Sequence, residues 1–382
     1  MEHYLGALIG KYDIHCEPLL DPVLDVPGMM PANITLTNYR NRLIWAVRLA
    51  SYLYLPFTQD PNISKIRFLQ SPSQSKIAIG EWHGNSKLLD LPAGNTALWG
   101  MFSGPEDPRL YTVYDPKETL YMIVARPDME PNKVEQVVYR LDDSLQPETS
   151  FRVPSPNAME KNWAPVQGGW HEFLYDPSQG TTVKLTSNST HPDTANLVGP
   201  TQFSNQDGGS SQVIPLDEYR WMTITHNRWW HSMGGYVRFS YNHNLRIMHR
   251  EGPNFVTDKC LDFRFLIPGI EFCCGLTEFQ DRIYIGFSIW DGSVHVLSFP
   301  KSNLDIILDA LAGDTGCEVS DYFTNSLKYR ITGVWNHPSM IQWIGHGLSQ
   351  EQELDIIEDC QGYLPSNILD SLRIQVIMRH RA

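Results

Sequence analysis

The chain has 382 residues, a formal charge of −13, and 42% hydrophobic, 11% aromatic and 19% charged residues. This length supports a large core and excludes a small module or a disordered tail, and the aromatic content favours a folded protein rich in strands. The negative charge, without any block of basic residues, argues against nucleic acid as a partner.

The first residues lack the basic region and the apolar length of a signal peptide, and the most apolar later run, 43–57, is interrupted by Arg48. We therefore expect no membrane span and a cytoplasmic location. The cysteines form no CxxC pair and no zinc-binding spacing with histidine. We expect reduced core thiols, and neither a metal nor a cofactor, from the six of them: Cys16, Cys260, Cys273, Cys274, Cys317 and Cys360.

Five segments each consist of two apolar or alternating runs joined by a tight polar turn, which is the pattern of a β-hairpin. They span 34–48, 109–126, 171–185, 211–226 and 270–290. One hairpin is not stable alone, and repeats at this wide spacing are typical of sheets arranged around an axis. The sequence predicts an all-β fold, a five-bladed β-propeller over residues 1–300, with a β-sandwich as the alternative. We expect the functional site in the central channel, because the innermost strands of the blades point their polar side chains into it.

After Pro300 the pattern changes. Apolar residues recur at i, i+3 and i+4, which predicts a mainly helical C-terminal extension over residues 301–382. Ser302 or Asn303 is expected to cap its first helix. The pattern does not reveal what the extension does, and homo-oligomerisation is one of the roles left open.

The segment SGPEDPRL, 103–110, comes directly before the second hairpin. Pro108 is expected to hold Asp107 in an extended conformation. Arg109 is close enough in sequence to share an ion network with Glu106, which would leave Asp107 as the proton carrier. Composition alone also fits an ordinary charged turn.

The segment EKNWAP, 160–165, comes before the third hairpin. Lys161, Asn162 and Trp163 would offer a cation, an amide and an aromatic face to a sugar or an anionic group. The alternative is the start of a strand that carries a core tryptophan.

Two further parts of the sequence contain candidate functional residues. His226, Arg228 and His231 are predicted to crowd one loop after the fourth hairpin, and two histidines are too few for a metal, so we favour stacking and hydrogen bonding. Asp291 follows an apolar strand and is a candidate for binding the substrate. The alternative is that it caps the turn that follows. The chain contains no GxSxG, no phosphate-cradling GxxxxGK[ST] and no HExxH motif.

The order of these motifs resembles that of a known group. EDPR, Lys-Asn-Trp-x-Pro, Gly-Gly-Ser, and IEFCCGL followed by a strand and an aspartate are similar to glycoside hydrolase family 130 and the related mannosyltransferases of glycosyltransferase family 108. The resemblance covers about residues 30–300. It implies a five-bladed propeller that acts on β-mannosides with inversion, as a phosphorylase, a hydrolase or a transferase.

The resemblance also implies roles for single residues. Asp107 corresponds to the group's general acid, supported by Glu106 and Arg109. Asn33 and Arg48 correspond to residues that line the sugar site.

Lys161 and His226 correspond to residues beside the phosphate in the phosphorylases. Two positions depart from the group. Its third-blade His-Arg pair is replaced near Tyr175-Asp176, which removes an anion-binding arginine, and its tyrosine after the fourth blade is His231.

These observations favour an enzyme that makes or breaks a glycosidic bond to a hexose, by implication mannose. The partner would be an oligosaccharide or a sugar donor, either a sugar phosphate or a nucleotide sugar. An inverting hydrolase is the alternative and needs a second carboxylate as base, for which the candidates are Glu160, Glu172 and Glu271. A sugar-binding propeller without catalysis is the second alternative, with stacking platforms at Trp163, Trp229 and Trp230.

Overall fold

In the computed structural model, residues 5–313 are described except for 58–59, 69, 71, 115, 154–156, 158–160, 188–192, 201–207, 234–235, 266–270 and 290. Beyond residue 313 only 354 and 373 are described, and of 53–68 and 228–240 only the backbone is described.

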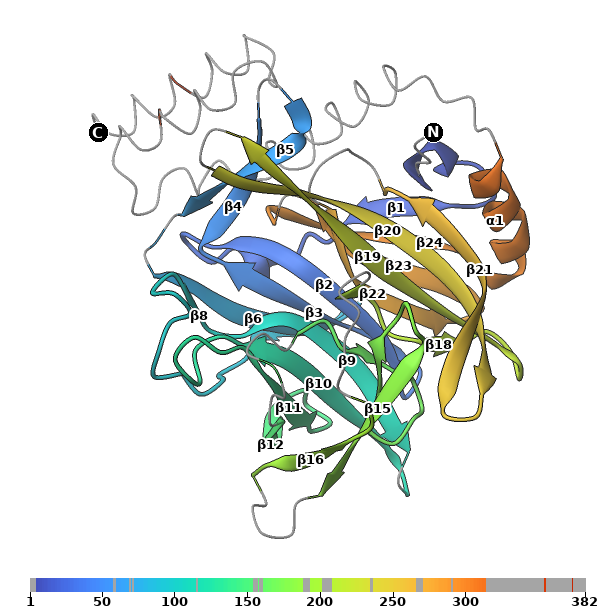
Figure 1. The fold of residues 1–382 in the computed structure, drawn as a ribbon, viewed down its shortest axis with the longest axis horizontal. Helices are drawn as coiled ribbons and strands as arrows, with labels where there is room; N and C mark the ends of the chain where they lie inside the picture. Colours follow the sequence, from blue (N-terminus) through green and yellow to red (C-terminus); the bar gives the residue numbers. More distant parts are fainter. Residues whose placement is uncertain are drawn as a thin grey trace.

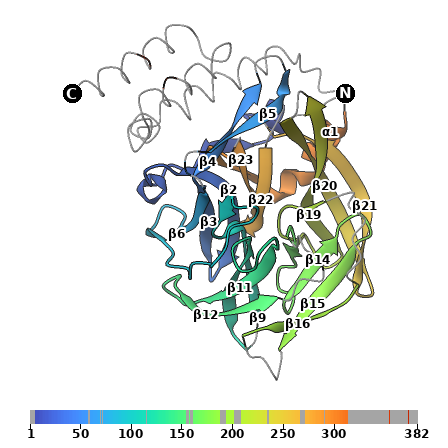
Figure 2. The same cartoon turned by 60° about the vertical axis from the view of Figure 1, so that its left-hand side comes forward.

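The strands form five antiparallel sheets that follow one another in chain order around a centre (Figure 1 and Figure 2). Blade 1 contains β2 (Met30–Tyr39), β3 (Arg42–Ala50), β6 (Ser73–Glu81) and β7 (Ser86–Leu88), with β8 (Phe102–Ser103) parallel to β6. Blade 2 contains β9 (Glu106–Tyr114), β10 (Glu118–Arg126), β11 (Glu135–Leu141) and β12 (Pro147–Val153). Blade 3 contains β13 (Ala164–Pro165), β14 (Glu172–Asp176), β15 (Thr181–Ser187) and β16 (Ala195–Val198).

Blade 4 contains β17 (Gly208–Gly209), β19 (Arg220–Met233), β20 (Tyr236–Glu251) and β21 (Asn254–Phe263), with β18 (Ile214–Pro215) beside β19. Blade 5 contains β22 (Glu271–Phe279), β23 (Arg282–Ile289) and β24 (Ser293–Pro300). Its outer strand comes from the other end of the chain, because β1 (His15–Pro18) pairs with β24. The N-terminal strand thereby closes the ring, and the predicted five-bladed propeller is confirmed.

The predicted hairpins form within the blades, with one correction. The fourth, 211–226, has a first arm of only two residues, Ile214 and Pro215, and the long hairpin of blade 4 is instead β19 with β20. Residues 210–212 do not continue that arm: their side chains are buried, those of Ser210 and Ser211 bond within blade 4, and that of Gln212 bonds to neighbouring blades.

Five hydrophobic cores fill the five spaces between successive blades. Leu110 and Ile44 belong to the core between blades 1 and 2, and Trp163 and Tyr111 to the core between blades 2 and 3. Each blade therefore buries both faces. This explains why the sequence shows apolar residues on both sides of its strands.

A single glutamine joins four blades at the centre of the ring. Gln212 of blade 4 donates through Nε2 to Thr35 Oγ1 (2.9 Å), to the Leu36 carbonyl (2.8 Å) and to the Leu110 carbonyl (2.7 Å). Its Oε1 accepts from the Leu276 amide of blade 5 (2.8 Å). Gln212 is fully buried, so this polar group is stable there only because its partners are in place.

The part of the predicted extension that is described is short. It comprises the 3-10 helix η3 (Lys301–Asn303) and α1 (Leu304–Ala312), which packs Leu304, Ile307 and Leu311 on the core between blades 4 and 5. Asn303 holds the N-cap position of α1 but makes no capping bond, and its amide donates to the Tyr12 carbonyl instead. The helices predicted beyond residue 313 lie outside the described residues.

A two-stranded hairpin, β4 (Tyr52–Phe57) with β5 (Asp60–Phe68), is inserted between β3 and β6 of blade 1. Strand β5 reaches across to contact β20 of blade 4, and both figures show the two hairpins side by side (Figure 1 and Figure 2). Two short 3-10 helices, η1 (Leu5–Leu8) and η2 (Pro22–Leu24), flank β1.

No helix among the described residues has the length and apolar character needed to span a membrane. The prediction of core thiols holds for Cys273 and Cys274, which are buried, but not for Cys260, which is exposed. Cys260 lies on β21, the outermost strand of its blade, where alternate side chains face solvent. Cys317 and Cys360 lie outside the described residues.

Candidate functional site

Two innermost strands carry a bulge at the same kind of position. In β2 the register shifts between Ala32 and Ile34, and in β9 the pairing skips the residues between Glu106 and Arg109. The bulged residues Asn33 and Asp107 have φ of +49° and +48°. The expected extended conformation of Asp107 before Pro108 is therefore wrong: the bulge overrides the local preference and redirects the side chain.

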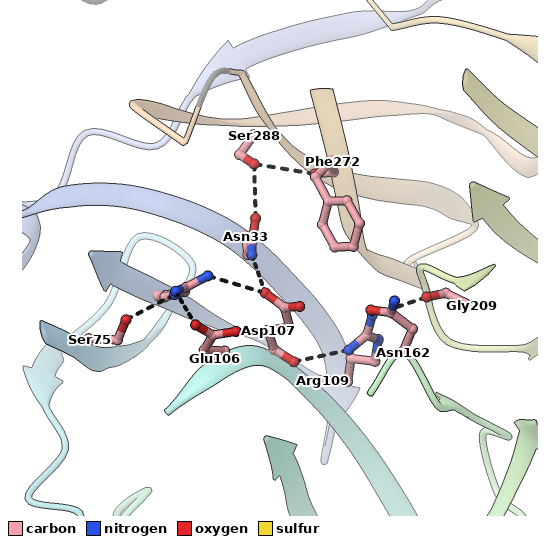
Figure 3. A network of polar contacts seen from close by, with 10 residues as sticks. Asn33, Ser75, Glu106, Asp107, Arg109, Asn162, Gly209, Phe272 and Ser288 are labelled. Carbon is pink, nitrogen blue, oxygen red and sulfur yellow. Dashed lines mark hydrogen bonds and ion pairs between the residues drawn. The ribbon is translucent and has the colours of Figure 1, made fainter. Parts of the chain in front are cut away.

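The two bulged residues contact each other. The Asn33 amide donates through Nδ2 to Oδ1 of Asp107, and Ser288 Oγ of blade 5 donates to Asn33 Oδ1 (3.2 Å; Figure 3). Arg48 Nη1 lies 3.5 Å from the same Asp107 oxygen. Within the described part of the chain, Oδ2 of Asp107 accepts no hydrogen bond. One carboxylate oxygen is thus fixed, and the other is left for a ligand.

Glu106 is paired with a different arginine from the one expected. Arg48 Nη2 donates to Glu106 Oε1 (2.8 Å), and Arg48 Nε donates to Ser75 Oγ (3.1 Å). All three side chains are buried, and burial opposes the charge on Arg48 while the Glu106 carboxylate raises its pKa. The predicted network between Glu106 and Arg109 is wrong because the guanidinium of Arg109 turns toward blades 3 and 4, where it bonds to Asn162, Gly209 and Ser210.

Arg109 joins its own blade to the two that follow. It donates to the main-chain oxygens of Ser210 (2.8 Å), Gly209 (3.1 Å) and Asp107 (3.1 Å), and to Oδ1 of Asn162 (3.3 Å). Its buried guanidinium thereby holds the Asp107 main chain and places a positive charge near the Asp107 carboxylate.

The cations around Asp107 determine its charge. Burial raises its pKa, but Lys161, Arg48 and Arg109 and the Asn33 bond together lower the pKa below its ordinary value. Asp107 is therefore an ionised acceptor at neutral pH. Lys161 is half-buried and forms no ion pair with any described residue, so its ammonium group is free to meet an anion.

A second buried carboxyl lies close by, on blade 5. Burial raises the pKa of Asp291 to about 6; the Asp107 and Glu106 charges add to this rise, while Arg48 and a bond from Tyr52 oppose it. Asp291 has φ of +48°, in the left-handed region that aspartate tolerates. The sequence suggested a turn cap as the alternative role of Asp291, and it did not predict that this side chain is buried near Arg48.

The two other residues of the KNW motif separate. Asn162 is connected to the site by its side-chain oxygen, which accepts a hydrogen bond from Arg109. Its main-chain carbonyl lies so close to Gly209 that a Cβ on Gly209 would be 2.3 Å from the carbonyl oxygen. Trp163 instead packs its indole against Phe173 and Tyr175 in the core and is only 2% exposed. That leaves no ring face for a sugar, because the indole fills the space between blades 2 and 3.

His226 is buried at the fourth blade, with Nδ1 2.7 Å from Ser210 Oγ and its ring against Tyr241 and Phe272. A Cβ on Gly208 would meet the imidazole at 2.6 Å, so the glycine is needed for this close approach. The predicted loop of 226–231 is wrong, because these residues continue β19 and pair with β20 through to its end. The side chains of Arg228, Trp229, Trp230 and His231 lie outside the described part.

The carboxylates predicted as hydrolytic bases have other partners. Glu172 forms a two-bond ion pair with Arg250 (2.7 and 2.9 Å), and Glu271 accepts from the Phe265 amide (2.7 Å). Glu160 lies outside the described residues. Among the described residues, no three His, Cys, Asp or Glu side chains are grouped as a metal would require.

The structure adds site residues that the sequence did not indicate, namely Tyr52, Ser75, Ser210, Gln212 and Ser288. All except Ser75, which bonds Arg48 within blade 1, have a partner on another blade. The Gly-Gly-Ser motif before the fourth hairpin is a local sign of this close packing, because Gly208 packs on His226 and Gly209 on Asn162.

Comparisons with other proteins give no match to a protein-family model and no match among curated proteins. Similar solved structures include the β-1,2-mannobiose phosphorylase of Listeria innocua (TM-score 0.47, 14% identity, 78% of this chain and 99% of that chain). Two others, from Leishmania mexicana, are the mannose phosphorylase MPT-4 (0.40, 11%, 73% and 86%) and the GDP-Man-dependent mannosyltransferase MPT-1 (0.42, 13%, 75% and 90%).

Proposed function

We propose that this protein is an inverting carbohydrate-active enzyme that transfers a hexose between a phosphate-bearing donor and a sugar hydroxyl, with Asp107 as the proton-transferring group. The observation that carries the proposal is the environment of Asp107. It is a buried carboxylate with one oxygen fixed by donors, and nearby lies the half-buried Lys161, which forms no ion pair with any described residue. The motif resemblance supports mannose as the hexose and an inverting reaction.

The charge of Asp107 suits it to act as the base when the glycosidic bond forms. As an ionised acceptor it removes the proton from the acceptor hydroxyl while the hydroxyl oxygen attacks the anomeric carbon from the face opposite the phosphate. The bond from that carbon to the phosphate oxygen breaks, and its electron pair leaves with the phosphate. In the reverse direction the same carboxyl group, now protonated, returns the proton to the glycosidic oxygen.

One carboxylate is enough for this chemistry because a phosphate leaves without being protonated. Lys161 would stabilise the negative charge that develops on the departing phosphate, and a positive group in a partly buried site does this more strongly than in water. Direct hydrolysis needs a separate base that activates water. Of the candidate bases, Glu172 and Glu271 are engaged by Arg250 and the Phe265 amide, which supports transfer or phosphorolysis over hydrolysis by either of these two.

The test is a product assay with mannose 1-phosphate or GDP-mannose as donor and mannose or a β-mannobiose as acceptor. Proton NMR of the product reports the configuration at the new bond. The proposal expects a new disaccharide or trisaccharide with inverted configuration, and none with Asp107→Asn. Release of free mannose from a mannoside without phosphate would instead support the hydrolase.

A further inference from the structure

The hairpin β4–β5 leaves blade 1 through a closed neck beside the site. The Ser51 amide donates to the Gln74 carbonyl (2.9 Å), and the Gln74 amide donates to Ser51 Oγ (2.7 Å). On the far side of the neck, the Ser73 amide donates to the Met101 carbonyl (2.6 Å). Residue 52 is therefore held in place although it begins an inserted element.

Tyr52, the first residue of this hairpin, is 4% exposed and turns toward the site rather than toward solvent. The Arg48 guanidinium lies over its ring at 5.2 Å, and the Phe102 ring meets it edge-on at 5.9 Å. Its hydroxyl hydrogen-bonds to the Asp291 carboxyl. These three contacts belong to blade 1, to the strand that leads into Glu106, and to blade 5.

The groups that act on Asp291 come from several elements. Arg48 of β3 is the cation, Glu106 and Asp107 of β9 are like charges, and Tyr52 of β4 is the neutral donor. The buried Cys274 thiol of β22 also lies within electrostatic range. Among these groups, Tyr52 is the one whose removal as Phe leaves every charge unchanged.

We propose that Tyr52 is a positioning residue of the reaction centre, whose hydroxyl orients the Asp291 carboxylate to accept a hydrogen bond from a hexose hydroxyl. This rests on the proposed transfer function. Asp291 is the group that would touch the sugar, and Tyr52 acts through it. The hairpin β4–β5 is thereby part of the site and not only an edge of blade 1.

The test compares Tyr52→Phe with Tyr111→Phe. Tyr111 is an equally buried tyrosine, and its hydroxyl bonds His171 Nδ1 (2.9 Å) in the core between blades 2 and 3. In protein with ¹³C-labelled aspartate, the Asp291 carboxyl signal is identified by its loss in Asp291→Asn and then titrated. Tyr52→Phe should raise the pH of its titration by about one unit, because a donor to the charged form is lost.

In turnover, Tyr52→Phe should lower kcat/KM by about threefold near pH 6.5, and the loss should disappear toward pH 8.5, where Asp291 ionises without help. Tyr111→Phe should show neither change, and Tyr52→Phe should add nothing in an Asp291→Asn background. An unmoved Asp291 titration overturns the inference, as does a loss that persists at pH 8.5. If the wild type turns over no sugar phosphate, the proposed function fails, and the titration still decides whether Tyr52 controls Asp291.

Discussion

Asn33 and Asp107 are the bulged residues of neighbouring innermost strands, and the amide of one donates to the carboxylate of the other. Both have left-handed φ angles, which Asn and Asp adopt at lower cost than other residues that carry a Cβ. The bond joins blade 1 to blade 2, so the geometry of the reactive carboxylate depends on how the ring is assembled.

Replacement of Lys161 by Met should weaken a phosphate-bearing ligand selectively. A cation that bonds a phosphate contributes about 1.5–3 kcal/mol, so mannose 1-phosphate or GDP-mannose should bind roughly ten- to a hundredfold more weakly. Binding of uncharged mannobiose should change little. Calorimetric titration measures both, and Lys133→Met, at an exposed lysine paired with Glu130, is the control. Equal losses for charged and uncharged ligands would contradict the role of Lys161.

Gly209→Ala should disturb the site by crowding. A Cβ on residue 209 would be 2.3 Å from the Asn162 carbonyl oxygen, and the Gly209 carbonyl accepts a hydrogen bond from Arg109. Such overpacking costs about 1–3 kcal/mol of the free energy of unfolding and should also weaken ligand binding. Denaturant unfolding gives the first quantity. Gly313→Ala, where the nearest atom to a Cβ is 3.4 Å away, should leave stability nearly unchanged.

Gln212→Ala should loosen the whole ring. The substitution leaves the Leu276 amide and the carbonyls of Leu36 and Leu110 without their partner in a buried place. We expect the free energy of unfolding to fall by about 3 kcal/mol or more, because each unsatisfied group adds its own cost. Thermal unfolding tests this. A loss no larger than that of an exposed glutamine would show that the blades do not depend on the central contact.

Acid should destabilise the fold through buried histidines. Burial lowers the pKa of His243 to about 3 and those of His171 and His295 to about 4. Below about pH 6.5 the histidines of the unfolded chain bind protons that those of the folded protein do not. The free energy of unfolding is therefore unaffected by these groups above about pH 6.5 and falls as the pH drops toward 4.

The sharpest test of this effect is His243→Leu. Neither ring nitrogen of His243 has a hydrogen-bond partner among the described residues, and Phe263 and Phe265 surround the ring. The variant should be at least as stable as the wild type at pH 7 and should lose less stability between pH 6.5 and 4 in chemical denaturation. An unchanged dependence on pH would contradict the assignment.

The sequence predicts the features that depend on neighbouring residues. Alternating runs with polar turns identified the hairpins of blades 1, 2, 3 and 5, since strand pairing across a tight turn is local. It also pointed to Asp107, although it gave the wrong backbone for it. A proline rule describes an isolated dipeptide, and the bulge in β9 is imposed by its partner strand β10.

The partners of the charged residues were not predictable in this way. Arg48 pairs with Glu106 across 58 residues, and Arg109 reaches Ser210 across 101. Nothing in the pattern around Tyr52 or Gln212 indicates that ring closure brings them to the centre. Trp163 shows the opposite case, in which an aromatic residue next to polar ones belongs to the core, where its indole packs against Phe173 and Tyr175.

The central claim is that Asp107 transfers a proton in a reaction with a phosphate-bearing donor. The measurement is turnover and affinity of Asp107→Asn with mannose 1-phosphate or GDP-mannose and a mannoside acceptor, beside Asp217→Asn at an exposed aspartate. The account predicts that Asp107→Asn loses at least about a hundredfold in turnover while it still binds the donor, and that Asp217→Asn behaves as the wild type. Full turnover in Asp107→Asn would contradict it.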